Sequence, residues 1–373
     1  MLKSLTVSNF KAFANPVTID FSKTGNYEFN QEAIKNDIVK TALIYGKNAS
    51  GKSSIGLAIF DIVANLTDNF VDIKNYINYK NLINDSPFVS FDYKFIFQNT
   101  EIEYSYIKTD IRIIVAEKLG IGKKTVIEYD KRKPDTLLAI NMKGAENINV
   151  DLSQLNFSAL RFVKANVILA ENEENSIFYE FYNFVDKMLL FWSLETREFI
   201  GFTPVSGKEI IPEIIKKGHF EDLQRFFKEA GIEDELTHRN INGREQLLIN
   251  FNGKYMDFGL ASSSGMSSLL LLYYWLEDIS DCKKCPSLVF IDEFDAFYHY
   301  ELSVFIIDRL KKANCQVILS THNTAMFSND ILRPDCYYIC SKNKIENAHS
   351  STPKEIRFGN NLEKLYKGGT FGK

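Results

Sequence analysis

One nine-residue segment limits the folds that this chain can adopt. Residues 46–54 read GKNASGKSS, and the first eight of them match the phosphate-binding pattern G-x4-GK[ST]. An apolar run, Ile38–Tyr45, leads into the segment, and residues 53–66 carry apolar side chains at helical spacing after it. A strand, a glycine loop and a helix in this order predict an α/β fold of the P-loop NTPase class.

The loop offers a complete set of phosphate ligands. Its glycines let backbone N–H groups turn toward phosphate oxygens, Lys52 can reach the β- and γ-phosphates, and the Ser53 hydroxyl can bind Mg2+. The N-terminus of the following helix adds a positive field. We therefore expect a nucleoside triphosphate to be bound by Gly46, Asn48, Ala49, Ser50, Gly51, Lys52, Ser53 and Ser54.

Two apolar strands further along the chain end in polar side chains. Leu288–Ile291 runs into Asp292 and Glu293, and Gln316–Ser320 is followed by Thr321 and His322. An acid at the carboxyl end of a strand beside a P-loop is placed to hold Mg2+, which assigns Asp292 to the metal and Glu293 to the attacking water. His322 could sense the γ-phosphate. The alternatives are a solvated acidic turn and a satisfied histidine at a strand end.

A serine-rich segment, Ala261–Met266, precedes a predicted helix. The Ser263 hydroxyl and the Gly265 backbone at a helix N-terminus form a second anion site, useful if it meets a γ-phosphate held by another subunit. An ordinary N-cap is the alternative. His299 could reach across such an interface or be a plain surface or core histidine.

Composition narrows the class of protein. The formal net charge of −4 does not favour nucleic acid as a partner, although a local basic groove stays open. No apolar run approaches the roughly 18 residues needed to span a bilayer, so we expect no membrane association and a cytoplasmic location. The five cysteines include a CxxC at Cys282 and Cys285, but the spacing of Cys336 and Cys340 does not complete a zinc ribbon, so we favour reduced thiols.

Periodicity along the chain predicts three parts. Residues 1–133 hold the P-loop and β-hairpins, which include 2–8 with 16–21 and 91–97 with 101–107. Residues 134–240 are expected to form an inserted helical lobe, because 172–194 and 207–236 carry apolar residues at helical spacing. Residues 241–373 begin with a hairpin at 246–258, for which Asn252 and Gly253 are the turn signal. They then return to strands that alternate with helices, which predicts a largely parallel sheet.

Six segments in a fixed order add a family resemblance. They are SNFKAF at 8–13, the loop 46–54, Ser263–Met266, IDEFDAFYH at 291–299, STHN at 320–323, and the ending 361–372. Together they resemble the ABC-type ATPases of the OLD (overcoming-lysogenisation-defect) group from bacterial abortive-infection and phage-defence systems, and their SMC-like relatives. The resemblance implies an ABC/SMC-head type mixed sheet with an antiparallel β subdomain. This sequence departs from the family pattern in two places. Its signature loop is not LSGGQ, and Gln98 and Gln154 are only weak candidates for the Q-loop glutamine.

The resemblance also implies a function. ATP would bind at Lys52 and Ser53, Asp292 would assist Mg2+, Glu293 would catalyse hydrolysis, and Ser263 and Gly265 would act in trans within a homodimer or higher homo-oligomer. We expect a slow, regulatory ATPase that senses infection and controls a separately encoded effector such as a nuclease or toxin. The main alternative is an SMC- or repair-type ATPase that clamps DNA. A transporter subunit, a small-molecule kinase and a guanine site at residues 343–346 fit the motifs less well.

Overall fold

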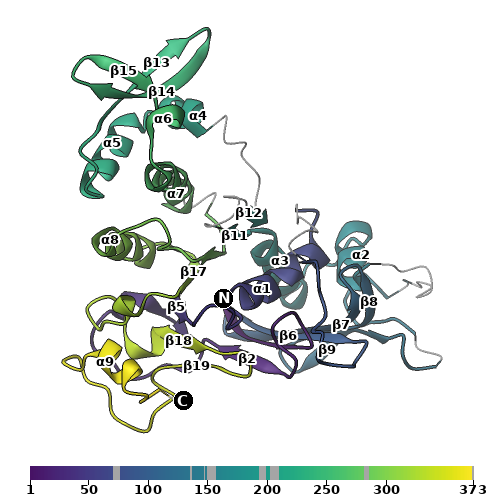
Figure 1. The fold of residues 1–373 in the computed structure, drawn as a ribbon. Helices are drawn as coiled ribbons and strands as arrows, with labels where there is room; N and C mark the ends of the chain where they lie inside the picture. The colour runs from purple at the N-terminus through teal and green to yellow at the C-terminus, as the bar shows by residue number, and fades with distance from the viewer. Residues whose placement is uncertain are drawn as a thin grey trace.

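The computed structural model describes residues 1–69, 76–134, 137–146, 148, 157–192, 199–201, 210–280 and 285–371. It contains two seven-stranded sheets, a three-stranded sheet and a two-stranded ribbon (Figure 1). The ribbon pairs β3 (Ile34–Lys35) with β4 (Ile38–Val39). Within these described residues, no helix has the length and apolar character needed to cross a membrane.

The first sheet is antiparallel throughout and has the order β10-β9-β8-β7-β6-β1-β2. Its strands alternate buried and exposed side chains, so one face packs against helices α1 (Lys52–Leu66) and α3 (Glu173–Asp186). The strands are β1 (Leu2–Ser8), β2 (Val17–Asp20), β6 (Val89–Phe97), β7 (Thr100–Asp110), β8 (Ile113–Ile121), β9 (Lys124–Asp130) and β10 (Ala139–Ile140).

The second sheet carries the phosphate loop and has the order β12-β11-β16-β17-β5-β18-β19. The neighbours from β11 to β18 are parallel, whereas β12 and β19 close the two edges in antiparallel fashion. Its central strands are buried on both faces, and their carboxyl ends lie at one edge. The strands are β5 (Thr41–Tyr45), β11 (Met188–Trp192), β12 (Phe199–Gly201), β16 (Leu288–Asp292), β17 (Gln316–Thr321), β18 (Tyr337–Cys340) and β19 (Ile345–Asn347).

The remaining elements flank these sheets. Figure 1 shows the three-stranded sheet with α4 and α5 at the end of the molecule farthest from α9, and α7 between it and the body. The elements are α2 (Ala159–Asn166), α4 (Ile210–Lys216), α5 (Phe220–Glu229), β13 (Glu235–Ile241), β14 (Arg244–Phe251), β15 (Lys254–Asp257), α6 (Phe258–Ala261), α7 (Ser264–Ser280), α8 (Tyr300–Lys311), α9 (Leu362–Lys367) and the 3-10 turns Gln31–Ala33, Thr324–Met326 and Pro334–Cys336.

One buried side chain joins the two large sheets. Gln316 at the start of β17 accepts a hydrogen bond from the Leu2 backbone N–H at 3.0 Å and donates to the Leu2 and Val39 carbonyls at 3.0 and 3.1 Å. Its side chain is 1% exposed, so all these bonds are shielded from water. The first strand of the chain is therefore fixed to a strand that lies 314 residues later.

The predicted hairpins are confirmed. β1 pairs with β2, β6 pairs with β7 through a left-handed turn at Gln98 and Asn99, and β14 pairs with β15 around Asn252 and Gly253. Gly231 follows the end of α5 with φ 80°, as a helix-ending glycine should.

The helical reading of 172–194 is wrong after residue 186. Helix α3 ends at Asp186, and the run Met188–Trp192 is strand β11, which pairs in parallel with β16 inside the nucleotide-loop sheet. A run of five consecutive apolar residues is compatible with a buried strand as well as with a buried helix, so periodicity alone cannot distinguish a strand from a helix here. The predicted helical lobe 134–240 thus also supplies β11 and β12 to this sheet, and the boundaries at 133 and 240 stay a prediction.

Candidate nucleotide-binding site

The phosphate loop closes tightly between β5 and α1. Ala49 and Gly51 adopt left-handed conformations, with φ of 61° and 108°. A Cβ added at Gly46 would lie 2.2 Å from Ser50 Oγ and 2.9 Å from the Cys340 carbonyl oxygen, and one at Gly51 would lie 2.8 Å from the Phe13 ring. Close contacts therefore exclude a side chain at both motif glycines, and at Gly51 the left-handed backbone disfavours one as well.

Lys52 begins helix α1 with its ammonium turned into the loop. Its Nζ donates to the Gly46 carbonyl at 2.8 Å and to the Lys47 carbonyl at 3.3 Å, and the residue is only 5% exposed. A buried cation surrounded by loop backbone is placed to bind an anion. On the rim, Asn48 and Ala49 are exposed, and Ser54 is half-buried in the first turn of α1.

Two strands and the first turn of α1 converge at Asp292. Ser53 Oγ donates to Asp292 Oδ2 at 2.6 Å, and Ser320 Oγ donates to Asp292 Oδ1. Ser320 Oγ also accepts the Glu293 backbone N–H at 2.8 Å. The structure thus brings together the two predicted metal ligands, Ser53 and Asp292, and adds Ser320, to which the sequence had given no role.

Glu293 follows Asp292 in a left-handed conformation with φ 45°, which is uncommon for a residue with a side chain. Burial and the neighbouring Asp292 charge raise the pKa of the Glu293 carboxyl, while Lys52 and His322 oppose that rise. The candidate base therefore binds a proton more readily than an ordinary glutamate does. His322 itself is exposed on the loop after β17.

A second contact joins the two turns at this edge of the sheet. Thr321 Oγ1 donates to Asp295 Oδ2 at 2.8 Å and accepts the Asn323 backbone N–H at 2.9 Å. Asp295 lies three residues after Asp292, and sequence reasoning missed it. The available signal was the third carboxylate in the IDEFD run.

Ser263 and Gly265 are not brought to the phosphate loop of the same chain. Among the described contacts, Ser263 Oγ accepts the Met266 backbone N–H at 3.2 Å, and a Cβ at Gly265 would lie 3.1 Å from the Phe297 carbonyl oxygen. Ser263 is exposed and caps α7. The N-cap geometry is therefore present, and a role in trans stays a prediction.

The loop fits ATP phosphates and Mg2+ on structural grounds. Ser50 Oγ is buried with no hydrogen-bond partner in the described part of the chain, and it lies where a Cβ at Gly46 would intrude. Ser53 and Asp292 offer oxygen ligands, and magnesium in nucleotide sites completes its shell with phosphates and water. No group of three or more His, Cys, Asp or Glu side chains placed to hold a metal occurs among the described residues.

Other predicted candidates have separate positions. His299 caps α8 by accepting the Leu302 backbone N–H at 3.3 Å, and Gln98 donates to Glu180 at 2.8 Å on the antiparallel sheet. Gln154 and Cys282 lie outside the described residues, so the CxxC is not tested. Cys315, Cys336 and Cys340 are free thiols.

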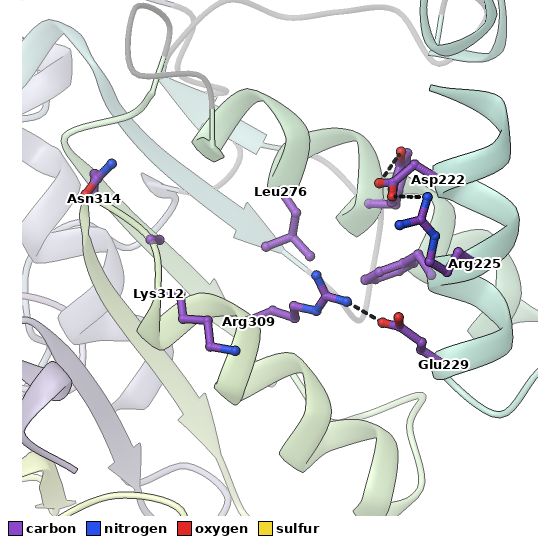
Figure 2. Close-up of a pocket in the computed structure, with 10 residues that line it drawn as sticks. Asp222, Arg225, Glu229, Leu276, Arg309, Lys312 and Asn314 are labelled. Atoms are coloured by element: carbon purple, nitrogen blue, oxygen red, sulfur yellow. Dashed lines mark hydrogen bonds and ion pairs between the residues drawn. The ribbon is translucent and has the colours of Figure 1, made fainter. Parts of the chain in front are cut away.

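A hollow of about 290 Å³ lies between α5, α7 and α8, away from the phosphate loop (Figure 2). Arg309 pairs with Glu229 across it, and Arg225 pairs with Asp222 at 3.4 Å. Two of the three basic side chains that line the hollow, Arg225 and Arg309, therefore already have carboxylate partners.

Comparisons with known proteins agree with the P-loop NTPase class that the sequence predicts. A family profile described as "AAA domain, putative AbiEii toxin, Type IV TA system" matches residues 42–328. An SMC head bound to the C-terminal winged-helix domain of ScpA superposes with a TM-score of 0.50 at 14% identity, covering 93% of this chain and 97% of that one.

Two further SMC heads are similar to this chain. The head from Thermotoga maritima has 15% identity, coverages of 95% and 99% and a TM-score of 0.44. The head with a coiled coil and joint derived from Pyrococcus yayanosii has 10% identity, coverages of 98% and 99% and a TM-score of 0.48. No curated protein sequence matches this chain significantly.

Proposed function

We propose a function from one premise: this chain belongs to the AAA domain family whose profile spans residues 42–328. It is an ATPase domain of the AAA/SMC-head type, and its sheets match the P-loop fold expected from the sequence. We infer that it binds ATP with Mg2+ at residues 46–54 and Asp292 and hydrolyses the γ-phosphate. The 2.6 Å hydrogen bond from Ser53 to Asp292 carries this inference, since it joins the loop to the acidic strand end.

Each residue would have a defined task. ATP supplies the phosphoryl group, and Mg2+ supplies charge neutralisation when bound. Backbone N–H groups of the loop and Lys52 hold the phosphate oxygens, while Ser53 and Asp292 hold the metal. Glu293 accepts a proton from the attacking water at its carboxylate, a task that its raised pKa supports.

The second half of each site would come from another copy. Ser263 is exposed at the N-terminus of α7 and its described contacts do not reach its own phosphate loop, which supports a contact with nucleotide held by a partner subunit. We therefore propose a homodimer or higher homo-oligomer that closes around ATP.

We further propose that this switch is slow and controls a separate effector, such as a nuclease or toxin, in a cytoplasmic anti-phage system. The OLD-like motifs support this proposal, and so does the family description, which names an AbiEii toxin and a type IV toxin–antitoxin system. Co-purification with the product of a neighbouring gene, followed by an assay of ATP-dependent nucleic-acid cleavage, tests the effector directly.

A DNA-clamping ATPase is the second candidate, because the similar SMC heads share this fold. It requires a basic surface and binding that weakens steeply with salt. The net charge of −4 favours the first candidate. Retention on duplex DNA that falls with added salt would reverse this preference.

ATP turnover gives the decisive experiment. Glu293→Gln keeps the shape of the base but removes its proton affinity, so phosphate release should fall at least about 100-fold while ATP binding persists and ATP-dependent oligomers accumulate. Lys52→Ala should abolish both binding and oligomers. Glu301→Gln, an exposed carboxylate on α8, is the matched control. Normal turnover by the Glu293 variant would remove this residue from the mechanism.

A further inference from the structure

The two turns at the carboxyl ends of β16 and β17 form one hydrogen-bonded unit. Ser320 Oγ contacts both Asp292 and the Glu293 backbone N–H, and the Ser320 carbonyl accepts the Phe294 N–H at 3.1 Å. Thr321 Oγ1 then donates to Asp295 Oδ2 at 2.8 Å. Hydrogen bonds from consecutive residues thus connect the turn that carries the candidate base with the turn that carries His322.

Asp295 has one oxygen occupied and one available. Oδ2 accepts the Thr321 hydroxyl, whereas Oδ1 is buried and has no hydrogen-bond partner in the part of the chain that the structure describes. A buried carboxylate oxygen without a donor is costly, so it favours any nearby N–H that can reach it.

His322 and Asn323 are the neighbouring side chains with suitable N–H donors. His322 follows Thr321 directly, and it acts electrostatically on the Asp295 carboxyl. Burial raises the pKa of Asp295, and hydrogen bonding from the Thr321 and Asn323 side chains and the electrostatic effect of His322 act against that rise. His322 is exposed, so its ring requires a fixed partner if it is to hold one orientation.

We propose that Asp295 is the positioning residue for His322: one carboxylate oxygen holds Thr321, and the other accepts a ring N–H of His322. A carboxylate that accepts one imidazole N–H fixes the tautomer and orientation, which leaves the second ring nitrogen to act on substrate. This inference rests on the proposed ATPase function, in which His322 contacts the γ-phosphate. Asp295 itself does not touch the nucleotide.

The competing explanation is a purely structural Asp295. Its backbone carbonyl accepts the Tyr298 N–H at 3.2 Å, so the residue also belongs to the turn before α8. A structural role predicts a loss of stability that is independent of His322, whereas the positioning role predicts a loss of turnover that depends on His322.

A double-mutant cycle in the full-length protein separates these explanations. We expect Asp295→Asn to lower kcat by about 10- to 100-fold with KM for ATP changed less than about twofold, a size typical of residues that orient a functional histidine. In a His322→Ala background, Asp295→Asn should cause little further loss. Equal fold losses in both backgrounds, or no loss in the wild-type background, would overturn the proposal.

Two controls accompany the cycle. Asp330→Asn makes the same change on an exposed aspartate whose described hydrogen bonds are to Ser328, and it should leave kcat unchanged. Thr321→Val removes the hydroxyl that donates to Oδ2 and accepts the Asn323 N–H, and it should lower kcat less than Asp295→Asn does. Melting temperatures of all variants show whether a loss of kcat accompanies unfolding.

A second readout does not need turnover. Nitrogen-15 spectra of the five histidines, with His322 assigned by its alanine variant, report the tautomer of each ring. Asp295→Asn should shift the His322 ring nitrogens and leave His349 unchanged. If the protein hydrolyses no ATP but these nitrogens shift, the proposed function fails and the Asp295 contact stands. Unchanged nitrogens in an active ATPase reject the contact alone.

Discussion

Gly51 and Gly253 both have left-handed backbones, with φ of 108° and 88°, but their surroundings differ. A Cβ at Gly51 would lie 2.8 Å from the Phe13 ring, whereas no atom lies within 4 Å of a Cβ at Gly253. Any L-residue in this conformation costs about 1–2 kcal/mol. A substitution at Gly253 therefore reports backbone strain alone, whereas a substitution at Gly51 reports backbone strain and the contact with Phe13.

Alanine at each position tests this difference. Gly253→Ala should lower the free energy of unfolding by about 1–2 kcal/mol and leave ATP binding intact. Gly51→Ala should destabilise the protein more and weaken ATP binding about tenfold or more, because either the loop or Phe13 must move. Urea titration and fluorescent-ATP binding measure the two effects. Equal behaviour of both variants would show that Phe13 does not constrain the loop.

The sequence predicted the residues that belong to the motifs, and it missed those whose roles depend on the pairing of neighbouring strands. The convergence of Lys52, Ser53 and Asp292 follows from the motif and from the strand ends, since parallel strands end at one edge. Ser320 and Asp295 were missed because serine and aspartate after a strand are common and only the pairing of β16 with β17 places them together.

At the scale of elements, a buried ion pair fixes α1 to the antiparallel sheet. Lys108 Nζ on β7 lies 2.7 Å from Asp61 Oδ1 on α1, and both side chains are 0% exposed. The hydroxyls of Tyr106 and Tyr79 also donate to Asp61, at 2.7 and 2.9 Å. Burial lowers the pKa of Lys108, and the Asp61 charge opposes that shift. The helix that carries Lys52 is thereby held at its middle.

Removing one partner should be costly. Lys108→Met leaves a buried carboxylate without its cation, and we expect a loss of about 3–5 kcal/mol in unfolding free energy. Asp61→Asn combined with Lys108→Met should be more stable than Lys108→Met alone, since the amide carries no buried charge and its oxygen still accepts from one of the two tyrosines. Urea unfolding measures both.

The same substitution at Lys118 is the control for this pair. Lys118 lies 3.7 Å from Glu128 with both side chains about half exposed, so Lys118→Met should cost about 0–1 kcal/mol. A similar loss at both lysines would mean that the Asp61 contact adds nothing beyond an ordinary surface pair.

Strand β11 marks the limit of sequence reasoning at this scale. The run Met188–Trp192 has no polar residue to reveal a period, and it follows an amphipathic helix after a single residue. Its place beside β16 depends on a pairing partner about 100 residues away, which a local pattern does not contain. The hairpins were predictable because their turn residues, such as Asn252 and Gly253, are local signals.

At the scale of the whole molecule, the proposed sites are shared between copies. A subunit with Lys52→Ala lacks a working phosphate loop but keeps its Ser263 segment, and a subunit with Ser263→Arg has the opposite defect. If each site joins the loop of one copy to the Ser263 segment of another, a mixed dimer regains one intact site.

Co-expression of these two inactive variants tests the sharing. Random pairing in a two-fold dimer should restore roughly a quarter of the wild-type ATPase rate. A dimer in which both subunits carry both substitutions provides the background rate. A mixture no more active than this background would place the complete site within one chain.

The Gln316 contact with Leu2 has a consequence for synthesis. At about 5–20 residues per second, a ribosome needs roughly 15–60 s to make the 314 residues between the two partners. During that time β5 emerges without either neighbour, because β17 and β18 begin more than 270 residues after it. The nascent phosphate-loop strand therefore has two open edges until both of its neighbours have been synthesised, and during that interval these edges can pair with other strands.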